Sequence, residues 1–398
     1  MKVDTNEQKI DEILSRGVVE VIEKDNLKKK LLSGKQLRIK LGIDPTSPNI
    51  HLGRATQLLK LKDLQDLGHK IVFIVGDFTG VIGDTSDKEV ERPMLSQAEI
   101  KKNLKSYFKQ MGIVLDTRKV EKKYNSKWLK KLGYTEIGEQ ADKFSVADFI
   151  ARENIKKRLD AGKRVSLREV LYPLMQGYDS VAVKADVEFG GTDQRFNLLA
   201  GRKLQESFGQ KAQDIIMTDI INGTDGRKMS SSWGNVINII DTPADMYGKI
   251  MSMKDENIIP YFVSVTRVPM SEVNEVEKKI NSNEMNPRDA KMKLAHEIVS
   301  MFHNEKDAKK AEEVFVKTFQ ERGVPEDIEE VGAKKGDSLG DILLQAGTVE
   351  SKNDFKRLIT SGAVKNIDTN RKIEDDKFEI KETVTLKIGK KRFVKITI

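Results

Sequence analysis

The sequence predicts an α/β protein whose first half is built on a parallel sheet. Short β-rich runs alternate with helical stretches in the first half, and charged helical repeats replace that pattern from about residue 242. Alternation of strands and helices is typical of parallel sheets. Length is a third observation, because 398 residues suffice for two or three domains of roughly 150 residues each.

The expected elements follow one another in chain order. Residues 1–23 predict an amphipathic helix with one apolar face, formed by Ile10, Ile13, Leu14, Val18 and Val21. The expected strands are residues 37–43, 70–75, 181–189 and 214–218, and the expected helices are residues 51–67 and 194–208. Because ligands bind at the carboxyl ends of parallel strands, the loops after these strands should form one functional rim.

These patterns divide the chain into four parts. Residues 1–240 are expected to form a Rossmann-like domain, with an insertion at about 98–163. Residues 241–322 predict an α-helical domain, in which Pro243 and Pro287 stand where prolines open helices. Residues 323–336 are expected to be a linker, and residues 337–398 predict a small α+β domain.

Composition excludes several classes of protein. The chain has no cysteine, which rules out disulfides and fits a reducing compartment, and its 4 histidines give no reason to expect a dedicated metal site. No apolar run reaches the roughly 18 residues that span a bilayer, so we expect no membrane association. The net charge of +8 favours a polyanionic partner such as nucleic acid, although a lysine-rich solvated surface would give the same value.

A candidate nucleotide site lies in residues 41–54, LGIDPTSPNIHLGR, which follow an expected strand and open a helix. Pro45 and Pro48 stiffen the turn, and Gly53 allows a nucleotide to approach the backbone closely. The start of a helix favours anions, and His51 can donate a hydrogen bond to a phosphate. A structural turn with a capping histidine is the alternative.

A second polar segment, GRKMSSS at residues 226–232, lies far along the chain. Lys228 is a mobile charge suited to a departing pyrophosphate, and the serines offer hydroxyls to phosphate oxygens. Alone, this segment could be a solvated surface turn. Together the two segments resemble the HxGH and KMSKS signatures of the class I aminoacyl-tRNA synthetases. Arg54 stands in place of the usual second histidine, and Ser231 in place of the usual second lysine.

A third segment, YPLMQGYD at residues 172–179, carries information about the substrate. Tyr172, Gln176 and Asp179 would share one helix face, which suits a zwitterion that also bears a phenol. An ordinary amphipathic helix would show the same spacing. Beside the other two segments, it resembles the tyrosine-binding helix of bacterial tyrosyl-tRNA synthetases. Some members of that family place a second tyrosine against the phenol where this chain has Lys40.

This resemblance implies an enzyme that activates L-tyrosine with ATP, accompanied by Mg²⁺, and transfers it to tRNA(Tyr). It also implies a cytoplasmic homodimer that pairs through the insertion. The implied catalytic residues are Thr46, His51, Lys88, Arg92 and Lys228. The implied tyrosine-binding residues are Thr79, Asp84, Tyr172, Gln176, Asp179 and Gln194. The implied ATP-binding residues are Gly42, Asp44, His51, Gly53, Arg54, Gly191, Asp193, Lys228, Met229, Ser230, Ser231 and Ser232.

Residues 338–398 resemble the small RNA-binding domain that is named after the ribosomal protein S4. The resemblance implies that RNA phosphates bind to basic residues of one helix and one strand, namely Lys352, Lys356, Arg357, Lys390, Lys391 and Arg392. A solvated basic helix is the alternative, because acidic residues are nearly as frequent in this tail.

Three other readings of the whole chain stay open at this point. A tryptophanyl or other class I enzyme would not need Asp179 for a phenol. A catalytically weakened tRNA-binding homologue is suggested by Arg54 and Ser231. An unrelated nucleotidyltransferase would not need the RNA-binding tail.

Overall fold

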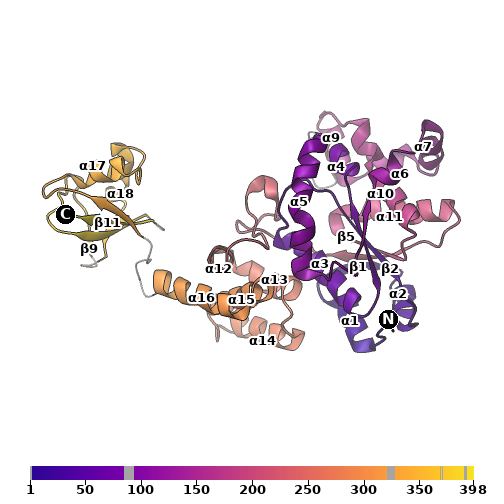
Figure 1. The fold of residues 1–398 in the computed structure, drawn as a ribbon, viewed down its shortest axis with the longest axis horizontal. Coiled ribbons are helices and arrows are strands. Elements are labelled where there is room, and N and C mark those ends of the chain that lie inside the picture. The colour runs from indigo at the N-terminus through magenta and orange to yellow at the C-terminus, as the bar shows by residue number, and fades with distance from the viewer. Residues whose placement is uncertain (1, 85–93, 321–327, 368, 370, 390–391) are drawn as a thin grey trace. The chain divides into compact units, whose positions relative to one another are not determined.

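The chain forms two compact units, Met1–Lys309 and Lys310–Ile398, each of which can be followed in Figure 1. The structure is a computed structural model and describes residues 2–84, 94–320, 328–367, 369, 371–389 and 392–398. Within these ranges, no helix is long and apolar enough to cross a membrane.

The first unit is built on a six-stranded sheet with the order β1-β6-β5-β2-β3-β4. Its strands are β1 Val18–Ile22, β2 Arg38–Ile43, β3 Lys70–Val75, β4 Glu121–Tyr124, β5 Val187–Gly191 and β6 Asp214–Thr218. The neighbours from β6 to β4 run parallel, and only the edge strand β1 is antiparallel to its partner. Strands β5 and β6 are buried along their whole length, as expected for central strands of a parallel sheet.

Helices connect these strands. They are α1 Glu7–Ser15, α2 Lys24–Leu32, α3 Leu52–Asp66, α4 Thr79–Ile82, α5 Gln97–Val114, α6 Ser126–Leu129, α7 Tyr134–Ala141, α8 Val146–Ile150, α9 Glu153–Asp160, α10 Leu167–Val183 and α11 Arg195–Ser207. Pro173 lies inside α10 and has no N–H to donate to the Glu169 carbonyl. That carbonyl accepts a hydrogen bond from Arg152 Nη2 at 3.3 Å instead, which compensates for the missing helical bond.

Two expected elements are wrong in part. Val18 and Val21 do not continue the first helix, because α1 ends at Ser15 and Gly17 adopts a φ of 60°. The expected strand at 181–189 is shorter, because α10 continues to Val183 and Lys184 ends it in the left-handed conformation. The sheet gains its sixth strand from the region expected to be an insertion, since β4 pairs parallel with β3.

The helical part of the chain follows the sheet. Its helices are α12 Pro243–Ser252, α13 Ile258–Val265, α14 Met270–Asn281, α15 Pro287–Phe302 and α16 Glu305–Phe315, of which α12 and α15 each begin at a proline. Arg16 Nη2 donates to the Phe262 and Thr266 carbonyls at 2.9 and 3.0 Å. Arg267 pairs with Asp63 of α3 at 3.0 Å. The Arg16 bonds hold the end of α1 against α13, and the Arg267 pair holds the segment after α13 against α3, the helix that begins at the candidate nucleotide site.

The second unit contains a five-stranded sheet with the order β7-β11-β10-β8-β9. Its elements are β7 Glu329–Gly332, α17 Leu339–Gln345, α18 Lys352–Thr360, β8 Val364–Asn366, β9 Arg371–Lys372, β10 Val384–Ile388 and β11 Arg392–Thr397. Both helices and the sheet share one apolar core that includes Leu343, Phe355 and Leu386. The expected linker at 323–336 is wrong for Glu329–Gly332, because β7 pairs parallel with β11 and belongs to this sheet.

Candidate active site

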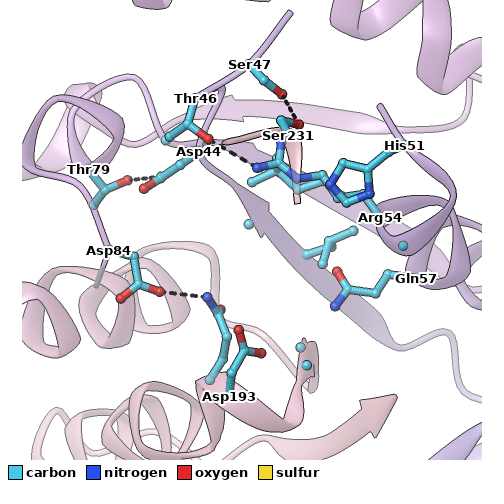
Figure 2. Close-up of a pocket in the computed structure, with 18 of the residues that line it drawn as sticks. Asp44, Thr46, Ser47, His51, Arg54, Gln57, Thr79, Asp84, Asp193 and Ser231 are labelled. Carbon is cyan, nitrogen blue, oxygen red and sulfur yellow. Dashed lines mark hydrogen bonds between the residues drawn. The ribbon is translucent and has the colours of Figure 1, made fainter. Parts of the chain in front are cut away.

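One cavity of about 900 Å³ opens where the loops after the parallel strands meet. Figure 2 shows part of its lining, with Asp44, His51 and Arg54 on one side and Asp84 and Asp193 on the other. The cavity brings together every described residue that the resemblance implies for ATP and tyrosine: Gly42, Asp44, Thr46, His51, Gly53, Arg54, Thr79, Asp84, Tyr172, Gln176, Asp179, Gly191, Asp193, Gln194, Lys228, Met229, Ser230, Ser231 and Ser232. Lys88 and Arg92 lie outside the described residues.

His51 occupies the N-cap position of α3 and is buried. Its Nδ1 has no hydrogen-bond partner among the described residues. Burial, and then the positive charges of Arg54 and Lys228, lower the pKa of His51 to about 3. The imidazole is therefore neutral near pH 7 and can act as a hydrogen-bond donor through one nitrogen.

The two signature segments contact each other at the mouth of this cavity. The Gly53 N–H points at Met229 Sδ, 3.3 Å away, and Ser231 Oγ donates to Ser47 Oγ at 3.3 Å. Lys228 Nζ pairs with Asp193 Oδ2 at 2.9 Å, which connects this loop to the end of β5. Segments that are far apart in the sequence thus form one polar surface, with cations and hydroxyls suited to phosphate groups.

Asp44 is the centre of a hydrogen-bond cluster deeper in the cavity. It accepts from the Tyr172 hydroxyl at 2.8 Å and from Thr79 Oγ1 at 2.7 Å. Burial, followed by the charges of Asp44 and Asp84, raises the pKa of Tyr172, so this phenol stays protonated and remains a donor. The backbone at Gly76 passes so close that a Cβ there would lie 1.9 Å from Asp44 Oδ1.

A second cluster connects α10 to the start of α11. Gln194 Nε2 donates to Asp84 Oδ2 at 2.8 Å, and Gln176 Nε2 donates to Gln194 Oε1 at 3.2 Å. Asn197 Nδ2 in turn donates to Gln176 Oε1 at 3.0 Å. Amide oxygens and carboxylates therefore line the cavity next to the Asp44 cluster, and this part of the lining is suited to an ammonium group.

Asp179 is buried on the same face of α10. Its carboxylate accepts from Trp128 Nε1 at 2.7 Å and from Asn125 Nδ2 at 3.2 Å. Burial raises its pKa to about 7, although Lys40 and these two hydrogen bonds oppose the shift. When ionised, Asp179 is a hydrogen-bond acceptor in the lining of the cavity.

The sequence reasoning missed Asn125 and Trp128. Asn125 directly follows β4, and Trp128 lies one turn further on in α6. Residues that follow the carboxyl ends of parallel strands are candidates for a binding site, and this rule applies to Asn125 and Trp128. It could not be used on the sequence, because the short, lysine-rich β4 does not look like a strand.

Lys40 does not face the cavity and is fully buried. Its Nζ pairs with Glu188 Oε1 at 2.8 Å and donates to Ser180 Oγ at 2.7 Å and to the Gln176 carbonyl at 3.0 Å. Lys40, which lies in β2, therefore connects α10 to β5.

The expected RNA-binding cations of the second unit are paired with neighbouring acids. Lys352 lies 2.6 Å from Asp341, Lys356 lies 3.2 Å from Asp376, and Arg357 lies 2.6 Å from Asp354. All these cations remain exposed on α18. Arg392 Nη1 donates to the Thr348 carbonyl. Lys390 and Lys391 lie outside the described residues.

The fold and the site define the class of protein. Residues 32–320 match the family described as "tRNA synthetases class I (W and Y)", and the chain belongs to this family. A tyrosine–tRNA ligase of Carboxydothermus hydrogenoformans is 46% identical over 100% of this chain and 99% of the relative. A tyrosine–tRNA ligase of Thermotoga maritima is 44% identical over 97% of this chain and 96% of the relative. Within the family, the chain therefore falls among the tyrosine–tRNA ligases.

Solved structures support the same fold. A C-terminally truncated mitochondrial tyrosyl-tRNA synthetase of Aspergillus nidulans has a TM-score of 0.64 and 20% identity, covering 78% of this chain and 94% of that chain. The tyrosyl-tRNA synthetase of Archaeoglobus fulgidus, solved in complex with L-tyrosine, has a TM-score of 0.61 and 23% identity, covering 77% and 99%. These similarities confirm the predicted α/β fold class.

Proposed function

We propose that this chain activates L-tyrosine with the ATP–Mg²⁺ complex and transfers the tyrosyl group to the 3′ end of tRNA(Tyr). Asp179 is the observation that carries the choice of amino acid. It is a buried carboxylate, held by Trp128 and Asn125, at the end of a cavity whose mouth is suited to phosphates. A phenolic O–H is the substrate group that such an acceptor binds.

The first step needs charge stabilisation more than proton transfer. A carboxylate oxygen of tyrosine attacks the α-phosphorus of ATP, the bond from that phosphorus to the bridging oxygen breaks, and its electron pair leaves on pyrophosphate. Thr46 and His51 would bind the phosphates from the turn after β2, and Lys228 would bind the departing pyrophosphate. Lys88 and Arg92 are assigned to pyrophosphate by resemblance alone.

The pair of Lys228 and Asp193 suggests how ATP would enter. Their charges neutralise each other at 2.9 Å. The ribose hydroxyls of ATP would donate to Asp193, and the phosphates would attract Lys228, so each partner gains a new contact as the old one opens. Gly42, Gly53, Gly191 and the segment from Met229 to Ser232 would line the rest of the nucleotide site.

The tyrosine ammonium would bind between the two carboxylates Asp44 and Asp84, with Tyr172, Gln176 and Thr79 around it. Gln194 would approach the tyrosine carboxylate. Rejection of phenylalanine would follow from Asp179, which is left without a substrate donor when the phenol hydroxyl is missing. Tyrosyl-tRNA synthetases are the standard example of this effect, with a known discrimination of roughly 10⁵-fold.

Exposed apolar side chains support the proposal of a homodimer. Tyr134, Val146, Ile150 and Leu159 lie on α7, α8 and α9 with exposed fractions of 96%, 74%, 41% and 45%. Large apolar groups on a monomer's surface often mark contacts with another protein. For the second unit, we propose that α18 and the strand at Arg392 bind tRNA phosphates, and we place the enzyme in the cytoplasm.

Amino-acid-dependent exchange of pyrophosphate into ATP tests this function. Purified protein should catalyse the exchange with tyrosine, and the rate with tryptophan or phenylalanine should be lower by several orders of magnitude. Exchange that depends on tryptophan would reassign the substrate. The absence of exchange with every amino acid would favour a weakened tRNA-binding homologue.

A further inference from the structure

Arg54 is a cation of the cavity that is bonded to hydroxyl groups rather than to carboxylates. Its Nη2 donates to Thr46 Oγ1 at 3.2 Å, and its Nη1 donates to the Tyr107 hydroxyl. Among the described residues, no carboxylate forms an ion pair with it, whereas Lys228 is paired with Asp193. A half-buried guanidinium held in this way retains its charge for an anion that enters the cavity.

The charge of Arg54 acts on the phosphate-binding turn. After burial, Arg54 is the largest cause of the lowered pKa of His51, ahead of Lys228. The guanidinium is also fixed in place, because the Tyr107 side chain that binds it is buried on α5. Its planar fork can donate to two phosphate oxygens in a fixed geometry, whereas a lysine ammonium is a point charge with rotatable donors and a neutral imidazole has one N–H.

Ser231 lies in the same corner of the cavity as Arg54. Its Oγ donates to Ser47 Oγ at 3.3 Å, and Ser47 is the chain neighbour of Thr46, which Arg54 contacts (Figure 2). A lysine at position 231 would bring a second positive charge beside the guanidinium. Like charges this close are unfavourable in a partly buried site. Arg54 and Ser231, the two residues that differ from the family signatures, therefore contact neighbouring residues of the same turn.

We propose that Arg54 and Ser231 form a compensating pair, in which Arg54 binds the β- and γ-phosphates and stabilises the departing pyrophosphate from the side where the signature lysine is missing. Arg54 acts on the same step as Lys228: the electron pair of the broken bond stays on pyrophosphate, and the guanidinium neutralises this charge without a proton transfer. The inference rests on the proposed activation of tyrosine.

A cycle of variants tests the pair in the full chain: Arg54→His, Ser231→Lys and the combination of both. The readouts are the single-turnover rate of tyrosyl-adenylate formation and the affinity for inorganic pyrophosphate in the reverse reaction. Arg54→His should lower the forward rate by about 10²-fold, the usual effect of removing one donor to a developing charge, with unchanged tyrosine affinity. Ser231→Lys alone should not increase the forward rate. The double variant should have a forward rate at least about tenfold higher than that of Arg54→His.

Arg118→His is the matched control, because Arg118 is 88% exposed and paired with Asp116 outside the cavity. It should leave both readouts unchanged. Arg54→Lys keeps the positive charge but not the planar fork, so its forward rate should lie between those of the native protein and Arg54→His. Thermal denaturation establishes that each variant is folded. The proposal is overturned if Arg54→His keeps the native rate and pyrophosphate affinity, or if the double variant shows only the sum of the single effects. A native protein without tyrosine-dependent exchange would instead overturn the proposed function.

Discussion

Asp179 is a buried carboxyl group that two fixed hydrogen-bond donors, Trp128 and Asn125, hold in place. Burial raises its pKa to about 7, so a large part of the protein holds a protonated Asp179 below pH 7 and an ionised one above it. The ionised carboxylate accepts hydrogen bonds at both of its oxygens, whereas the protonated form carries a hydrogen on one of them. The affinity for tyrosine, whose phenol donates to Asp179, should therefore increase as pH rises. Between pH 6 and pH 8 we expect the dissociation constant of tyrosine to fall by up to about tenfold.

Equilibrium binding of tyrosine, measured across this pH range, checks the prediction. Asp179→Asn should bind weakly at every pH and should lose the pH dependence. Trp128→Phe should move the midpoint of the native profile upward, because the indole N–H that opposes the raised pKa is lost. A flat profile for the native protein would contradict this role of Asp179.

Lys228 should affect the reaction more than the binding of tyrosine. It pairs with Asp193, which lines the part of the cavity proposed to bind ATP. Lys228→Ala should therefore slow single-turnover formation of the adenylate by about 10²-fold or more, with little change in tyrosine affinity. Activation at the native rate would exclude Lys228 from the transition state.

Spacing along one helix predicted that Tyr172, Gln176 and Asp179 share a face, because residues three or four positions apart lie on one side of a helix. The resemblance to the tyrosine-binding helix was needed to predict that this face lines a substrate site. The contacts of these residues could not be predicted. Nothing in the sequence shows that the Tyr172 hydroxyl turns to Asp44, a residue from the loop after β2. The same applies to Asn125, whose position depends on how β4 aligns with β3.

At the scale of elements, strands β3 and β6 match the expected ranges because dense runs of β-branched residues leave few alternatives. The apolar run at 181–189 was ambiguous, because a buried helix end and a buried strand have the same composition. Only the left-handed turn at Lys184 divides it. The edge strand β1 was not predicted for a related reason: Val18 and Val21 continue the apolar face of α1 in the sequence, and only the turn at Gly17 separates the strand from the helix.

Asp44 and Thr79 pack against the turn between β3 and α4, and Gly76 in this turn leaves room for both side chains. A Cβ at Gly76 would lie 1.9 Å from Asp44 Oδ1 and 2.4 Å from Thr79 Oγ1. Gly76→Ala should therefore displace both groups, lower stability by about 1–3 kcal/mol and weaken tyrosine binding.

Gly138→Ala is the matched control, because a Cβ at Gly138 in α7 would meet no atom within 4 Å. Removing a helical glycine there should stabilise the protein by about 0.5–1 kcal/mol. Thermal denaturation and tyrosine titration of both variants check the pair. Native stability and affinity in Gly76→Ala would show that the turn can relax without moving the site.

At the scale of the whole molecule, all described residues of the cavity belong to the first unit. Chemistry at the cavity should therefore not require the second unit. A chain that ends at residue 320 should keep tyrosine-dependent pyrophosphate exchange and should charge tRNA more slowly. Residue 320 is a better end point than residue 336, because β7 belongs to the second sheet and would be left without its partner strand.

Parallel assays of exchange and tRNA charging on the truncated and full chains check this division. We expect weaker salt dependence of charging after truncation, because fewer phosphate contacts remain. Full charging by the shorter chain would remove the second unit from tRNA binding. Loss of exchange, with the fold intact, would show that the cavity depends on residues beyond the first unit.

The central claim is that Asp179 recognises a phenol in one part of a cavity whose other part holds phosphates. A crystal structure of the protein with bound L-tyrosine tests it most directly. We predict that the phenolic oxygen lies within hydrogen-bonding distance of an Asp179 carboxylate oxygen, at about 2.5–3.0 Å, with the amino group near Asp44 and Asp84. A tyrosine ring that points away from Asp179, or binds outside this cavity, would contradict the account.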